Sequence, residues 1–167
     1  MGLNLGGKNL INILMNGCNG KMGQAISNLI AELDYIEIVS GVDRNPEKIK
    51  NNYPVYNSFE KVKEKIDVVV DFSHPTTLQD LLNFCTNNKT ALVVATTGLS
   101  SLDNEMLKQA SEYIPILVSA NMSIGINLIM NLISETAKTL YNNFDIEIIE
   151  KHHNEKKDSP SGTALML

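Results

Sequence analysis

The amino-terminal part of the sequence joins an apolar run, a glycine-rich loop and a helical pattern in direct succession. Residues 10–16 form the apolar run, and residues 17–23 form the loop, with a glycine at every third position. Apolar side chains then recur at helical spacing as far as Leu33. A strand followed by a glycine loop and a helix predicts a dinucleotide-binding α/β fold, because amide groups at the start of the helix can bind a pyrophosphate.

The glycine loop has the spacing Gly-x-x-Gly-x-x-Gly rather than the usual Gly-x-Gly-x-x-Gly, so taken alone it is weak evidence. A second apolar run over residues 36–42 strengthens it, because this run ends at Asp43, where a dinucleotide-binding fold places its ribose-binding acid. The alternative is that Asp43 and Arg44 begin a simple turn at the end of the strand.

Beyond Asp43 the sequence alternates between helical and strand patterns. Helices are expected over residues 58–65, 76–87 and 101–113, and strands over residues 68–71, 91–95 and 114–118. A long amphipathic helix over residues 123–142 then leads to a strand over residues 144–149. This alternation predicts an α/β fold with a Rossmann-like, doubly wound parallel sheet.

The composition limits the partners of the chain. Its 14 basic and 19 acidic residues give a net charge of -5 without a long basic cluster, which argues against nucleic-acid binding. No apolar run approaches the length of a membrane span, and residues 1–9 are too polar for a secretory signal, so a cytoplasmic protein is expected. Cys18 and Cys85 have no motif spacing and are expected to be reduced thiols.

Residues 150–163 concentrate reactive side chains directly after the predicted strand at 144–149. This segment contains His152 and His153, three lysines, and a Ser-Gly-Thr sequence that has the pattern of a helix start. A histidine and lysines can exchange protons, and free amide groups can hold a carboxylate or phosphate, so the segment suggests acid catalysis on an anionic substrate. The alternatives are a solvated loop or a metal site, although adjacent histidines without a cysteine fit zinc spacings poorly.

Small and polar residues follow three of the predicted strands. They are Phe72-Ser73-His74-Pro75, Ala95-Thr96-Thr97-Gly98 and Ser119-Ala120-Asn121-Met122. All three loops would lie at the carboxyl edge of the sheet, beside the glycine loop, where they could line a cofactor channel. Each loop taken alone fits an ordinary cap or turn better than a cofactor site.

Several of these motifs together resemble the dihydrodipicolinate reductases, also called 4-hydroxy-tetrahydrodipicolinate reductases. The resemblance begins at Gly17-Cys18-Asn19-Gly20-Lys21-Met22-Gly23 and includes Asp71-Phe72-Ser73 and Thr96-Thr97-Gly98. It is most specific at residues 150–164, which match the family signature Glu-x-His-His-x-x-Lys-x-Asp-x-Pro-Ser-Gly-Thr-Ala. The resemblance covers nearly all of the chain.

This resemblance implies an NADH- or NADPH-dependent oxidoreductase that reduces 4-hydroxy-tetrahydrodipicolinate, a small cyclic dicarboxylate, to tetrahydrodipicolinate in lysine and diaminopimelate biosynthesis. By motif, His152 and Lys156 would be catalytic, and His153, Gly162 and Thr163 would bind the substrate. No metal is implied. The implied cofactor-binding residues are Gly17, Cys18, Asn19, Gly20, Lys21, Met22, Asp43, Arg44, Ala95, Thr96, Thr97, Ser119, Ala120, Asn121 and Met122.

The resemblance also implies a domain division and an assembly. Residues 1–150 would form the dinucleotide-binding domain, and residues 151–167 would begin a substrate-binding domain that continues in the family into a tetramerisation sheet. Because the sequence stops at Leu167, we expect the 167-residue chain to be a monomer or weak oligomer with a frayed end at 161–167 and little activity. The competing interpretations are another NAD(P)-dependent Rossmann oxidoreductase, a nucleotide-sensing module and an inactive fragment of the reductase.

Overall fold

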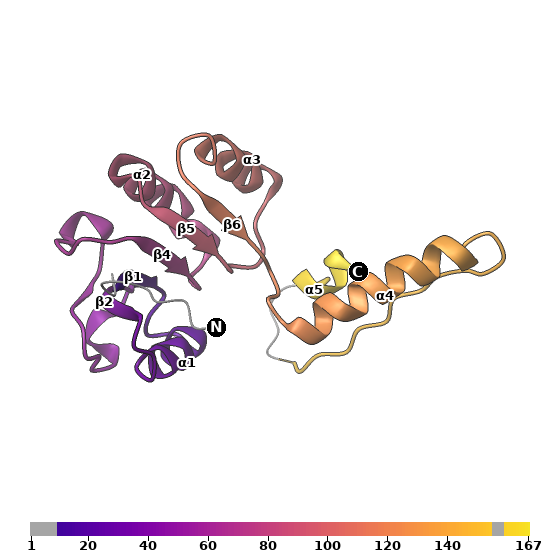
Figure 1. The fold of residues 1–167 in the computed structure, drawn as a ribbon, viewed down its shortest axis with the longest axis horizontal. Helices are drawn as coiled ribbons and strands as arrows, with labels where there is room; N and C mark the ends of the chain where they lie inside the picture. Colours follow the sequence, from indigo (N-terminus) through magenta and orange to yellow (C-terminus); the bar gives the residue numbers. More distant parts are fainter. Residues whose placement is uncertain (1–9, 155–158) are drawn as a thin grey trace, which may run out of the picture. The chain divides into compact units, whose positions relative to one another are not determined.

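The chain folds into two compact units, one ending at Val118 and the other spanning Ser119–Leu167. The computed structural model describes residues 10–154 and 159–167. Figure 1 shows the sheet and its flanking helices in the first unit, and two helices joined by a long segment in the second. Each unit is described by itself.

The first unit contains a six-stranded parallel sheet with the strand order β3-β2-β1-β4-β5-β6. This order confirms the predicted Rossmann-like, doubly wound fold. The strands are β1 Ile11–Asn16, β2 Ile36–Val42, β3 Val55–Tyr56, β4 Val68–Asp71, β5 Ala91–Val94 and β6 Ile116–Val118. The helices are α1 Lys21–Ile30, α2 Leu78–Asn88 and α3 Ser101–Ala110, with short 3-10 turns η1 Pro46–Lys48, η2 Phe59–Lys61 and η3 Pro75–Thr77.

The order of the strands reverses at β1, which pairs with β2 on one side and with β4 on the other. At its carboxyl end, Asn16 is in register with Val42 of β2 and with Asp71 of β4. The loops after these strands therefore leave the sheet at one edge. Ligands of open α/β sheets bind at such a reversal.

Alternating side chains of the central strands form a hydrophobic core on each face of the sheet. Leu14 belongs to one cluster, together with Leu81 of α2 and Leu107 of α3. Met15, the next residue of β1, belongs to the other cluster, together with Ile30 of α1. Helix α1 thus covers one face and α2 and α3 the other, as Figure 1 shows. Burial on both faces explains the continuous apolar character of these strands.

Two features of the first unit differ from the sequence-based expectation. The helix predicted over residues 58–65 is wrong: only the 3-10 turn η2 forms, and Val62 after it is extended, with φ -68° and ψ 125°. Phe59, Val62 and Ile66 have the apolar spacing of a helix, but all three reach the core from this irregular segment. Tertiary packing therefore satisfies the pattern without a helix. The two-residue strand β3 was not expected, because it is too short to show alternation.

The second unit contains α4 Ile124–Leu140 and the short helix α5 Gly162–Met166. The side chain of Ser123 caps α4 by accepting the Ile126 N–H at 3.4 Å. The strand predicted over residues 144–149 does not form, and Phe144, Ile146 and Ile148 are exposed. A strand needs a hydrogen-bonding neighbour, and the described residues supply none for this segment. No helix in the described part of the chain is long and apolar enough to cross a membrane.

Both cysteines are free, buried thiols of the first unit. Cys18 and Cys85 are completely buried, and desolvation by burial raises the pKa of each to about 12. The negative charge of a nearby carboxylate also raises each pKa: that of Asp43 acts on Cys18, and that of Asp71 acts on Cys85. Both thiols therefore stay protonated in the folded protein at pH values at which the same thiols in the unfolded chain begin to lose their protons.

These raised pKa values predict that the protein becomes less stable above pH 9. Between the unfolded and folded pKa values the folded state binds more protons, so the free energy of unfolding falls as the pH rises. We expect a loss of about 1 kcal/mol per thiol between pH 7 and pH 9.5, measured by urea unfolding. The double variant Cys18→Ala/Cys85→Ala should flatten this dependence, whereas an equally steep decline in the variant would contradict it.

Candidate functional site: the nucleotide edge and the catalytic segment

The glycine loop is shaped by contacts that leave no room for side chains. Gly17 has a φ of +78°, and a Cβ placed on it would lie 2.6 Å from the carbonyl oxygen of Phe72. A Cβ on Gly23 would lie 2.4 Å from the Gly17 carbonyl oxygen and 2.7 Å from the Cα of Cys18. The loop therefore packs directly against the backbone of the first helix and of the segment after β4.

Helix α1 begins beside this loop without a side-chain cap. Its N-cap residue is Gly20, whose own N–H donates to the Gly17 carbonyl at 3.0 Å. Glycine has no side chain to occupy the first amide groups of the helix, among them those of Lys21 and Met22. The side chains of both residues are exposed. An uncapped helix start over a tight glycine loop is suited to binding a phosphate anion.

Two residues of the loop turn their side chains into the protein. Cys18 belongs to the core cluster of α1, and Asn19 is only 3% exposed. The Asn19 side chain donates to the Asn45 carbonyl at 2.7 Å and accepts from Asn51 Nδ2 at 2.8 Å. Its N–H donates to Asp43 Oδ2 at 3.1 Å. The side chains of Cys18 and Asn19 thus hold the loop in place, and sequence reasoning gave no sign of this.

Asp43 and Arg44 lie after β2, at the same edge of the sheet. Besides the Asn19 amide, the Asp43 carboxylate accepts the N–H of Asn45 at 2.9 Å. The Arg44 guanidinium donates from Nη2 to Thr76 Oγ1, in the turn η3 that follows β4. Arg44 therefore connects the loop after β2 with the loop after β4.

A pocket of about 950 Å³ lies along this edge and includes Gly17, Gly20, Asp43 and Arg44 in its lining. One side of it is formed by α2, which sequence reasoning did not include. The contributing residues of α2 are Asp80, Asn83, Phe84, Asn87 and Asn88. Their spacing of three or four residues places them on one face of the helix. The polar residues at positions 80, 83 and 87 could therefore have indicated from the sequence that this face of α2 lines the site.

The loop after β5 also lies at the carboxyl edge of the sheet. Ala95 donates its N–H to the carbonyl of Asp71 at 2.9 Å, and Thr96 is buried, with its hydroxyl donating to Asp71 Oδ2 at 2.7 Å. Thr97 is exposed, and Gly98 next to it has a φ of +76°. Thr96 is therefore tied to β4, and the exposed part of the loop begins at Thr97.

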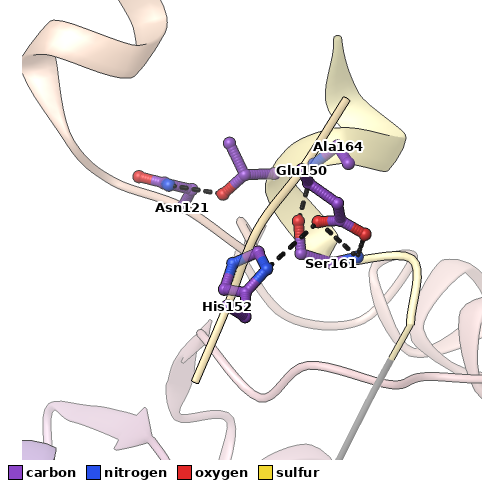
Figure 2. A network of polar contacts seen from close by, with 6 residues as sticks. Asn121, Glu150, His152, Ser161 and Ala164 are labelled. Atoms are coloured by element: carbon purple, nitrogen blue, oxygen red, sulfur yellow. Dashed lines mark hydrogen bonds and ion pairs between the residues drawn. The ribbon is translucent and has the colours of Figure 1, made fainter. Parts of the chain in front are cut away.

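The second unit holds the other group of predicted site residues, and Figure 2 shows part of it, including Asn121 and His152. Asn121 donates from Nδ2 to Thr163 Oγ1 at 2.7 Å, and its Oδ1 accepts the N–H of Ser123 at 2.8 Å. Ser119 Oγ donates to the Asn121 carbonyl at 2.9 Å, while Ala120 and Met122 are exposed. A residue predicted to bind the cofactor and one predicted to bind the substrate are thus in direct contact.

Glu150 organises the segment that carries the histidines. Its two carboxylate oxygens accept the Ser161 N–H at 3.0 and 3.2 Å, and Oε2 lies 3.5 Å from His152 Nδ1. Ser161 Oγ in turn accepts the N–H of Ala164 and so caps α5, whose first residue is Gly162. In Figure 2, dashed lines join the Glu150 carboxylate to His152 and to the backbone nitrogen of Ser161. His153 is exposed, and Lys156 lies outside the described residues.

The predicted site residues thus fall into two groups, one in each unit. The first unit contributes the glycine loop, Asp43, Arg44 and the loop 95–97, and the second contributes Asn121, His152, Thr163 and their neighbours. Within residues 10–154 and 159–167, no three or more side chains of the metal-binding types His, Cys, Asp and Glu are grouped to hold an ion.

Comparison with known proteins identifies the family and shows what share of a family member's length this chain covers. The 4-hydroxy-tetrahydrodipicolinate reductases of Clostridium tetani and Caldanaerobacter subterraneus are each 48% identical over 158 residues. Each match includes 95% of this chain but 62% of the relative. The chain therefore spans about 62% of the length of these curated relatives.

Solved structures agree with this comparison. A dipicolinate-bound dihydrodipicolinate reductase from Paenisporosarcina sp. TG-14 is 29% identical, with a TM-score of 0.71 over 93% of this chain and 63% of its own. A homoserine dehydrogenase of S. aureus, at 19% identity and a TM-score of 0.54, shares the fold alone. The family model "Dihydrodipicolinate reductase, N-terminus" matches residues 11–122, and "Dihydrodipicolinate reductase, C-terminus" matches residues 125–167. With both models matched in sequence order, the chain belongs to the dihydrodipicolinate reductase family.

Proposed function

We propose that this chain carries the dinucleotide-binding part and the catalytic motif of a 4-hydroxy-tetrahydrodipicolinate reductase of lysine and diaminopimelate biosynthesis. The observation that carries the proposal is the complete signature at residues 150–164, on a chain that is 48% identical to reductases of that name. The proposed reaction is the reduction of 4-hydroxy-tetrahydrodipicolinate to tetrahydrodipicolinate by NADH or NADPH, in which the cofactor supplies a hydride, a proton is taken up and the 4-hydroxyl group leaves as water.

The first unit has features that fit a dinucleotide. In the glycine loop a Cβ on Gly17 or Gly23 would collide with backbone, and α1 starts without a side-chain cap. Amide groups of Lys21 and Met22, at the start of α1, would hold the pyrophosphate, and Asp43 would accept a hydrogen bond from a ribose hydroxyl. The bound nicotinamide supplies the hydride. The loop at 95–97 would hold the cofactor at its other end.

The second unit would bind and protonate the substrate. A hydride added to an electron-poor ring leaves negative charge, which a nearby acid must neutralise. His152 would donate or accept a proton, and Lys156 would be the second proton donor. The residues that would bind a carboxylate of the substrate are His153, Gly162 and Thr163. The solved relative that contains dipicolinate supports a dicarboxylate ligand. The contact of Glu150 with Nδ1 of His152 would leave Nε2 of that ring to face the substrate.

We propose that the protein is cytoplasmic and that the complete reductase is a homotetramer, as the family resemblance implies. The 167-residue chain itself should be a monomer or weak oligomer. Analytical ultracentrifugation tests this assembly directly.

A nicotinamide-fluorescence assay on the purified 167-residue chain tests the function. NADH fluorescence should increase on binding, and adding enzymatically generated substrate to the complete reductase should oxidise the cofactor. Binding without oxidation in the complete reductase would favour a nucleotide-sensing module. Oxidation with other substrates only would indicate a different Rossmann oxidoreductase. Binding by the 167-residue chain without turnover, beside an active complete reductase, would identify the chain as a non-catalytic fragment.

Arg44 should determine how well the 2′-phosphate of NADPH is bound. Its guanidinium lines the pocket next to Asp43 and can pair with a phosphate. Arg44→Ala is expected to weaken NADPH binding by roughly 10-fold to 100-fold, the usual value of a charge-assisted hydrogen bond, and to affect NADH much less. Titration calorimetry with both nucleotides measures the difference.

Lys48 provides the matched control for Arg44, because it is an exposed cation of the next turn that does not line the pocket. Lys48→Ala should leave both affinities nearly unchanged. Equal losses of NADH and NADPH affinity in Arg44→Ala would contradict the assignment of Arg44 to the 2′-phosphate.

A further inference from the structure

A buried carboxylate lies at the carboxyl end of β4, at the start of the loops that follow three adjacent strands. Asp71 is the last residue of β4 and is only 2% exposed. It is in register with Asn16 at the end of β1 and with Val94 at the end of β5. The glycine loop, the loop after β4 and the loop after β5 therefore all begin next to this side chain.

Four donors converge on the Asp71 carboxylate. Oδ1 accepts from Asn16 Nδ2 at 2.8 Å, from Ser73 Oγ at 2.5 Å and from the Ser73 N–H at 3.2 Å. Oδ2 accepts from Thr96 Oγ1 at 2.7 Å. An ionised carboxylate has acceptors only and can satisfy all four donors. An amide of the same size would turn one of its N–H groups toward a donor.

Hydrogen bonds offset the free-energy cost of burying the Asp71 carboxylate. Among the ion pairs formed by the described residues, none includes Asp71. A buried carboxylate without a cation is costly unless hydrogen bonds satisfy it, so the three partner side chains are held firmly to it. Thr77 extends the cluster, since its Oγ1 lies 2.8 Å from Ser73 Oγ.

The segments that Asp71 holds are those of the proposed cofactor site. Asn16 directly precedes Gly17, whose Cα packs against the Phe72 carbonyl so closely that a Cβ would lie 2.6 Å from the oxygen. Thr96 belongs to the loop assigned to the far end of the cofactor. Movement of the loop after β4 would therefore displace both the phosphate-binding loop and the loop at 95–97.

We propose that Asp71 is a positioning residue for the dinucleotide, which fixes three loops of the binding edge in one arrangement without touching the ligand. The inference rests on the proposed function of this edge as a dinucleotide site. Removing the charge of Asp71 should misplace these loops. It should therefore weaken cofactor binding more than a substitution elsewhere in the fold that lowers the stability by the same amount.

The test is NADH titration of the 167-residue chain, wild type and Asp71→Asn, followed by fluorescence. Asp71→Asn is expected to weaken binding by roughly 10-fold to 100-fold, as for a buried network left with an unpaired donor. The anisotropy of the nicotinamide emission at saturation should also fall, since the loop at 95–97 would hold that end less firmly. A role in stability alone would not change this anisotropy.

Val69→Ala is the matched control, because Val69 lies two residues earlier in β4 and is fully buried in the core. It should lower the unfolding temperature yet change NADH affinity by no more than about 3-fold, since core truncation costs stability rather than contacts at the edge. An equal loss of affinity in Val69→Ala would overturn the positioning role, as would an unchanged affinity in Asp71→Asn.

Asn16→Ala keeps the proposal testable if Asp71→Asn does not fold. Asn16 is 2% exposed and donates to Asp71, so its removal should weaken NADH binding in the same direction, by roughly 3-fold to 10-fold. Unchanged affinity would overturn the proposal. Failure of the wild-type chain to bind NADH would instead refute the dinucleotide site itself, and the role of Asp71 with it.

Discussion

Replacing Lys156 with alanine in the complete reductase is expected to lower turnover by roughly 10²-fold to 10⁴-fold, the usual effect of removing a positioned acid. The reason is chemical. Hydride addition places negative charge on the substrate ring, and the lysine four positions after His152 is the one that the family signature aligns with a proton donor. Steady-state kinetics with NADH and substrate measures the loss, which should be in kcat rather than in the KM for NADH.

Lys157 gives this prediction its control, because it carries the same charge at the adjacent position. Lys157→Ala should change turnover little. Both lysines lie outside the described residues, so the distinction between them rests on the motif alone. Greater sensitivity at Lys157 would show that the signature is aligned wrongly on this sequence.

Gly23→Ala is expected to remove cofactor binding and to destabilise the first unit. A Cβ at this position would lie 2.4 Å from the Gly17 carbonyl oxygen and 2.7 Å from Cys18 Cα, and both are backbone atoms that cannot rotate away. Overpacking of this kind costs roughly 1–3 kcal/mol or more, and relief of the clash must move α1 away from the glycine loop. We therefore expect a loss of NADH affinity of about 100-fold or more, since small displacements of a binding loop have effects of this size.

Gly98→Ala separates the steric effect at Gly23 from the general effect of replacing a glycine. Gly98 has a φ of +76°, but among the described residues, its two chain neighbours apart, no atom lies within 4 Å of the position that an added Cβ would occupy. Its replacement should therefore cost only about 1–2 kcal/mol of backbone strain. Urea unfolding and NADH titration of both variants make the comparison. Wild-type affinity in Gly23→Ala would contradict the close packing of loop and helix as the basis of the site.

The fold and the glycine loop were predictable because their signals are local. The apolar run of β1, the glycine spacing and the helical periodicity of α1 follow one another in the chain, and the acid after β2 stands at the expected distance. The alternation of later strands and helices then limits the sheet to a parallel arrangement. The family resemblance was likewise carried by contiguous motifs, above all that of residues 150–164, and the comparisons confirmed it.

Other features depended on partners that are distant in the sequence. The helix expected over residues 58–65 was replaced by η2 and an extended segment, because Phe59 and Val62 reach the core of the sheet in that form. The strand expected over residues 144–149 has the right alternation, but a strand forms only beside another strand. A local sequence pattern indicates which side chains become buried, but packing against the rest of the fold determines the backbone conformation in which they are buried.

The sequence by itself therefore determined the class of fold, the order of most of its elements and the motifs that carry the proposed chemistry. Only the tertiary structure showed that Asn19 faces inward, that α2 forms one side of the pocket, and that Asp71 joins Asn16, Ser73 and Thr96. The residues joined by Asp71 come from the end of β1 and from the loops after β4 and β5, and they are separated by up to 80 positions, between 16 and 96. Strand pairing brings them together, and hydrogen bonds over a few ångströms act only once that pairing exists.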